Sequence, residues 1–131
     1  MVDALQGIAE RYEARMVIIR QHGKNGELFD MASFFGAIDR FAKPETWLVV
    51  VDQCVGGNAL EIENRTAGGL SMSDPVFQNM YRDIHQTIDG HFVGLAGGER
   101  VFELRAVDSS FWEVTGSPAF ESHMLQTYGA G

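Results

Sequence analysis

The sequence predicts an α+β domain in which helices pack against a single, largely antiparallel β-sheet. Three observations predict this class. Residues 100–115 form two alternating runs joined by a polar turn, residues 47–51 are continuously apolar, and several other segments repeat apolar residues at helical spacing. Three consecutive strands with short connections, at 91–96, 100–107 and 111–115, favour an antiparallel meander over a doubly wound sheet.

The segment 100–115 predicts a β-hairpin whose turn is formed by residues 108–110. With this turn, one register satisfies both faces of the hairpin. The expected cross-strand pairs are Ala106 with Trp112, Leu104 with Val114, and Arg105 with Glu113. The first two pairs are apolar, so Trp112 is expected to be buried on the core side.

The N-terminal half begins with a predicted helix at residues 3–15, capped by Asp3. Residues 16–19 are apolar without alternation, which is typical of an interior strand, and a turn is expected at 24–26. Asp30 is the expected N-cap of a second helix, which Pro44 ends. The apolar stripe of this helix consists of Phe34, Phe35, Ile38, Phe41 and Ala42.

The apolar run at 47–52 predicts a buried, central strand. Residues 59–63 alternate and follow a Gly-Gly-Asn turn, so they are expected to be its hairpin partner. Residues 64–73 show no periodicity and predict the longest loop.

Asp74 and Pro75 predict the start of a helix whose apolar face runs as far as Ile88, with Gly90 at its C-terminal end. After the meander, Ser117 and Pro118 begin a last helix that Gly129 ends. From the second helix onward, this order of elements resembles that of profilin-like domains, including the small roadblock type. The resemblance concerns the fold alone and implies no activity.

The length of 131 residues predicts one domain, at 1–131, and 45% hydrophobic residues can form its core. Cys54 is the single cysteine, so no intramolecular disulfide is possible and a cytoplasmic location is expected. The first residues lack the pattern of a signal peptide, and the longest apolar run, 47–51, is too short to span a membrane.

The formal net charge is -8, and acidic residues outnumber basic ones most strongly in the second half of the chain. Binding to nucleic acid requires clustered Lys and Arg, which the sequence lacks, so a nucleic-acid partner is not expected. An acidic surface attracts basic proteins, although it also serves solubility.

The residues capable of chemistry do not form a recognisable catalytic or metal-binding motif. The histidines and the cysteine are not spaced as paired metal ligands, so neither a metal nor a cofactor is expected; they are His22, His85, His91, His123 and Cys54. Nothing near Cys54 would lower its pKa. On the predicted strand at 59–63, Glu61 and Glu63 would share one solvent-facing side.

The sequence therefore favours a non-enzymatic protein-binding module, most concretely a small bacterial immunity or antitoxin-like protein that neutralises a basic partner. The residues expected to bind this partner are Glu61, Glu63, Asp108 and Glu113. The alternative is a small-molecule-sensing or dimerising regulatory domain, in which Trp112 lines a pocket and the chain forms a homo-oligomer. An enzyme of unrecognised type is a third possibility.

Overall fold

The computed structural model describes residues 16–129, which form one β-sheet with helices packed against it. The strands lie in the order β1-β6-β5-β4-β2-β3, and each neighbouring pair is antiparallel. The predicted α+β class is therefore confirmed, while the helix predicted at residues 3–15 lies outside the described residues. In chain order the elements are β1 (Val17–Arg20), α2 (Met31–Phe41), β2 (Thr46–Gly56), α3 (Ala59–Thr66), β3 (Leu70–Ser73), α4 (Asp74–Tyr81), β4 (Ile84–Ala96), β5 (Glu99–Val107), β6 (Phe111–Thr115) and α5 (Pro118–Tyr128).

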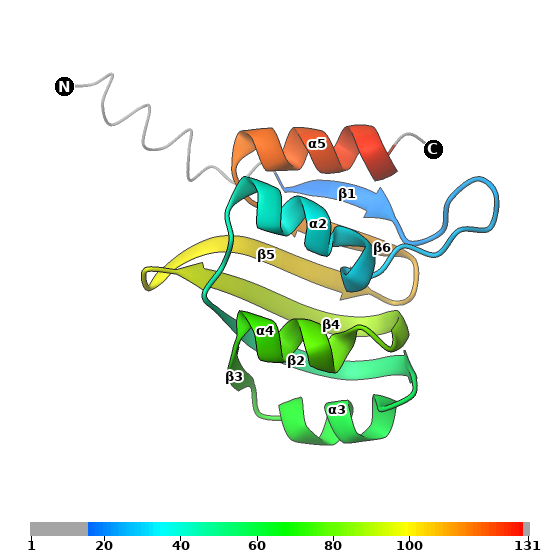
Figure 1. Cartoon of the computed structure of the whole chain (residues 1–131). Helices are drawn as coiled ribbons and strands as arrows, with labels where there is room; N and C mark the ends of the chain where they lie inside the picture. Colours follow the sequence, from blue (N-terminus) through cyan, green and yellow to red (C-terminus); the bar gives the residue numbers. More distant parts are fainter. Residues whose placement is uncertain (1–15, 130–131) are drawn as a thin grey trace.

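Helices α2, α4 and α5 cover one face of the sheet, and α3 lies beyond the edge of β2 (Figure 1). The three covering helices and the inward-facing strand residues share one core, whose largest side chains are aromatic, as expected from the apolar area such groups bury. Gly94 pairs with Trp47 across the strands, and a Cβ on Gly94 would lie 3.2 Å from the indole. A side chain at this position would crowd the ring, which glycine avoids.

The C-terminal hairpin has the predicted register. Ala106 pairs with Trp112, Leu104 with Val114, and Arg105 with Glu113. Trp112 is fully buried, and its indole donates a hydrogen bond of 3.1 Å to the carbonyl of Phe29. The helices predicted to begin after Asp30 and after Ser117 are also confirmed. They are α2, which has Asp30 as its N-cap, and α5, which has Ser117 as its N-cap.

The prediction for residues 59–73 was wrong. Residues 59–66 form the helix α3, where a strand was predicted at 59–63 and a loop from 64 onward. Residues 67–69 do form a connection, but 70–73 form the edge strand β3 instead of a loop. Ala, Leu and Glu have high helix propensity, and a five-residue alternation is too short to outweigh it. The buried residues of α3, Ile62 and Thr66, are four apart and so lie on one helix face.

The helix predicted from Asp74 to Ile88 was only half right. Helix α4 ends at Tyr81, and β4 begins at Ile84, so Gly90 lies inside a strand. The N-cap of α4 is Ser73. The carboxylate of Asp74, the first residue of the helix, accepts a hydrogen bond of 2.8 Å from the indole of Trp47. Ile84 and Ile88 fit both a helical and an extended pattern, and pairing with β2 selects the strand.

The positions of two strands in the sheet also differ from expectation. The β1 strand is at the edge instead of the interior, and β2 lies one strand in from the other edge, between β4 and β3. Continuous apolar runs predict burial on both faces, but only alternate residues of these runs are buried, and Ile18 and Leu48 are exposed. Such runs also do not specify the neighbouring strands. Within the described chain, no helix is long and apolar enough to cross a bilayer.

Candidate functional site

Carboxylates, of which Asp89 is half-buried and the others are exposed, lie at one end of the sheet, where β2 finishes and β4 begins. Val55 pairs there with Gln86, and the β5–β6 turn joins them because the amide of Ser109 donates to the carbonyl of Ile88 at 2.9 Å. We call this surface the acidic end. It is defined by Asp52, Asp83, Asp89 and Asp108.

The turn at 108–110 fixes the position of one of these carboxylates. Asp108 and Ser109 both have positive φ, at 51° and 56°, a conformation that aspartate tolerates better than most residues. The amide of Asp108 donates a hydrogen bond of 2.9 Å to Oδ1 of Asp89. The Asp89 carboxylate in β4 thus holds the backbone of the turn in place, and the Asp108 side chain is exposed.

The sequence-predicted partner-binding residues lie at or beside the acidic end, although two of them are not arranged as expected. Asp108 is part of it, and Glu113 lines a shallow depression of about 450 Å³ together with Asp52 and Asp89. Glu61 lies in α3 and borders a second depression with Asp83. Because residues 59–63 are helical, Glu61 and Glu63 do not share one outward face.

Glu63 has a structural contact that limits its availability to a partner. Its Oε2 accepts a hydrogen bond of 3.0 Å from the amide of Cys54 in β2. One turn further along α3, the Thr66 hydroxyl accepts from the amide of Val51 at 2.9 Å. These side chains satisfy amides on the edge of β2 beyond the last residue paired with β3, Val49. Glu61 instead forms an exposed ion pair of 3.8 Å with Arg65.

Sequence reasoning missed Asp52, Asp83 and Asp89. Asp52 ends the strongest apolar run of the chain, and a polar residue at the end of a buried strand is a signal for a surface position. Asp83 and Asp89 were hidden because their segment was predicted to be helical. The position of Asp89 beside the end of the Asp52 segment, and that of Asp83 before β4, depend on the long-range pairing of β2 with β4, which local patterns do not specify.

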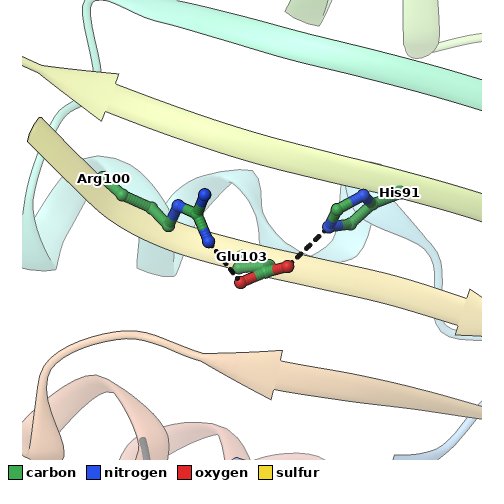
Figure 2. Close-up of polar contacts among 3 residues, drawn as sticks. All are labelled: His91, Arg100 and Glu103. Atoms are coloured by element: carbon green, nitrogen blue, oxygen red, sulfur yellow. Dashed lines mark hydrogen bonds and ion pairs between the residues drawn. The ribbon is translucent and has the colours of Figure 1, made fainter. Parts of the chain in front are cut away.

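The sheet face opposite the helices carries a polar cluster at its centre (Figure 2). Nε2 of His91 donates to Oε2 of Glu103 at 2.6 Å, and the Arg100 guanidinium lies 3.1 Å from the other carboxylate oxygen. Partial burial raises the pKa of Glu103, but the hydrogen bond and charge of His91, with Arg100, outweigh it and lower the pKa below its usual value. Glu103 is therefore held as a carboxylate and accepts at both oxygens.

A second polar network is buried between α2, α4 and β4. Asp30 accepts hydrogen bonds from Thr87, at 2.7 Å from the amide and 3.2 Å from the hydroxyl, and the Thr87 hydroxyl also bonds to the phenol of Tyr81. Burial raises the pKa of Asp30 to about 6, although the hydrogen bonds from Thr87 and from the amide of Met31 act against it. The network links three elements inside the core.

The remaining candidates for chemistry have ordinary surroundings. Burial, with a smaller contribution from Glu63 and Asp30, raises the pKa of Cys54 to about 11, so its thiol stays protonated at neutral pH. Trp112 packs against Phe34 and Phe92 in the core, where it has no exposed surface to offer a ligand. His85 is exposed on β4 rather than on a helix, and no three potential ligands among residues 16–129 are grouped to hold a metal ion.

Comparisons with protein-family models, with curated proteins and with solved structures found no significant match to this chain.

Proposed function

We propose that this chain is a non-enzymatic protein-binding module whose acidic end binds a basic protein, as an immunity or antitoxin-like protein would. The observation that carries the proposal is that Asp52, Asp89 and Asp108 come together from separate segments at one end of the sheet, where Asp83 precedes β4. Glu61 and Glu113 extend this negative surface on two sides. The nearby cations are fewer, namely Arg65, Arg82 and Arg105.

The physical basis of the proposal is electrostatic attraction over a distance. Charges on an exposed surface act mainly on the encounter of two proteins and raise the association rate with an oppositely charged partner. Their reach is about 8 Å at physiological ionic strength, so binding of this kind weakens as salt increases. The protonated thiol of Cys54 and the fully buried Trp112 support a binding role over a nucleophilic or ligand-sensing one.

A charge-matched pair of variants tests the proposal. The full chain is used to capture partners at low salt, and association rates are measured with each basic protein recovered. The test variant is Asp52→Asn/Asp83→Asn/Asp108→Asn, and the control is Glu27→Gln/Asp39→Asn/Glu99→Gln, whose residues are also exposed but lie elsewhere. Both variants change the net charge from -8 to -5, since each removes three carboxylates.

The test variant should associate at least tenfold more slowly than the wild type and show a flatter salt dependence, while the control keeps most of the rate. Asn is compatible with the positive φ at position 108, so the turn should be preserved. Equal slowing in both variants would show that only net charge matters. That result, or the recovery of no basic partner, would contradict the proposal.

A further inference from the structure

The face of the sheet opposite the helices has no cover within residues 16–129, and it has an ordered pattern of side chains. Alternation along the strands places His91 on this face because Phe92 points into the core, and the same holds for Glu103 beside Leu104. Three of the exposed large hydrophobic residues of the chain lie here: Met16, Ile18 and Leu48 are 45%, 53% and 45% exposed. We call this surface the open face.

The strand register arranges the open face in two adjacent rows that run across β1, β6, β5, β4 and β2. The first row is Ile18, Glu113, Arg105, His91 and Val50. The second row, two residues away along each strand, is Met16, Thr115, Glu103, Val93 and Leu48. Each row therefore has an apolar residue at both ends and a charged residue on the central strand β5.

We propose that the open face binds a second copy of this chain in a two-fold symmetric dimer. A two-fold axis that lies between the rows, perpendicular to the strands, places each row against the other row of the partner. Arg105 then faces Glu103 of the second copy, and apolar residues face apolar residues at both flanks, as Ile18 with Met16 and Val50 with Leu48. The pattern is self-complementary in both charge and polarity, as a two-fold interface requires.

The dimensions of packed sheets agree with this pairing. Two sheets that stack face to face are about 10 Å apart, and an Arg and a Glu side chain together span that gap. Glu103 is held in its charged form by His91 and Arg100, and each of its oxygens can accept a second hydrogen bond, from the partner's guanidinium. The first row borders the acidic end at the depression that Asp52, Asp89 and Glu113 line, so a dimer would cover part of that surface. The tests below measure self-association and therefore do not depend on whether a basic partner exists.

A charge-exchange experiment tests the dimer through the facing pair. In Arg105→Glu, the new carboxylate at position 105 would face the Glu103 carboxylate of the second copy. In Glu103→Arg, the new guanidinium at position 103 would face the Arg105 guanidinium of the second copy. Each variant alone should dimerise at least tenfold more weakly than the wild type in sedimentation velocity with the full chain. Mixing the two variants should restore association as a heterodimer, because opposite charges then face each other at both pairs.

A second pair of variants tests the apolar flank without disturbing the polar cluster. Leu48→Ser should weaken the dimer, whereas Leu60→Ser, at a residue that is 70% exposed on α3, should not. Thermal melts of each variant check that the fold is intact. A wild-type chain that stays monomeric would overturn the proposal. The open face would then be in contact with solvent, with another protein or with residues 1–15. A mixture of the charge variants that does not form heterodimers would overturn it as well.

Discussion

Asp30 is the N-cap of α2, as predicted, and its amide donates a hydrogen bond of 3.2 Å to the Ser33 hydroxyl. Its carboxylate has a further role that the sequence did not predict, because it accepts hydrogen bonds from Thr87, 57 residues further along the chain. A carboxylate in the core is unfavourable in its charged form, which is why the pKa of Asp30 is raised to about 6. Each protonation state of this residue therefore has a different effect on stability.

The stability contribution of Asp30 should fall as the pH rises. Its pKa is about 6 in the folded protein and near 3.8 when unfolded, so the folded state binds more protons between these values. The contribution is fully present below pH 3.8 and is lost as the pH rises through 6. A shift of this size corresponds to about 3 kcal/mol. Asp30→Asn should remove this term, which is measured by denaturant unfolding from pH 4 to pH 7.

The quantity to compare is the free energy of unfolding of the wild type minus that of the variant at each pH, because other groups titrate in both proteins. This difference should decrease across the range for Asp30→Asn. It should stay constant for the control Asp83→Asn, whose side chain is exposed. Parallel profiles for the wild type and Asp30→Asn would show that Asp30 has an ordinary pKa.

Trp112 tests the assignment of faces in the hairpin. It is fully buried and has edge-to-face contact with Phe34, with ring centroids 5.4 Å apart. Trp112→Ala should lower the free energy of unfolding by roughly 3 to 5 kcal/mol, through lost burial and the cavity left behind. Chemical denaturation measures the loss. A loss of less than about 1 kcal/mol would be inconsistent with a core position.

Among the elements, those with a long or unambiguous pattern were predicted best. The register of β5 and β6 was predicted because the same pairing matches apolar residues on one face of the hairpin and oppositely charged residues on the other. Helix α5 was predicted from its Ser-Pro start. Residues 59–66 and 84–88 were misassigned because each fits both a helical and an extended pattern over a few residues. Contacts with β2 determine the secondary structure of both segments, and these contacts join residues that are far apart in the sequence.

The docking of α3 on β2 depends on the Thr66 hydroxyl, which accepts from the amide of Val51 and donates to the carbonyl of Ile62. Thr66→Val keeps the shape but leaves the buried amide of Val51 without its acceptor. The variant should lose about 1 to 3 kcal/mol in the free energy of unfolding. Glu63→Gln, which retains an acceptor oxygen for Cys54, should be close to neutral by the same measurement. Similar losses in both variants would assign the effect to α3 itself rather than to the edge of β2.

For the whole molecule, the candidate site was only partly predictable. Asp108 and Glu113 were found because both belong to the hairpin, where local pattern and tertiary structure agree. Asp52 and Asp89 were not found, because only the pairing of β2 with β4 brings them together. The core-facing side of the hairpin was predicted from its apolar pairs, but local pattern does not show whether a further layer packs on the other side of the sheet.

The attachment of α3 also affects how the protein resists aggregation. A strand with free amides and carbonyls at its edge is a template on which strands of other molecules can stack without limit. Beyond β3, the edge amides of Val51 and Cys54 are already bonded to side chains of α3, so this template is closed. The β3 edge itself has only four residues. The fold thus discourages fibre growth along this side of the sheet, whereas the dimer proposed above would use the open face, where a two-fold contact ends at two molecules.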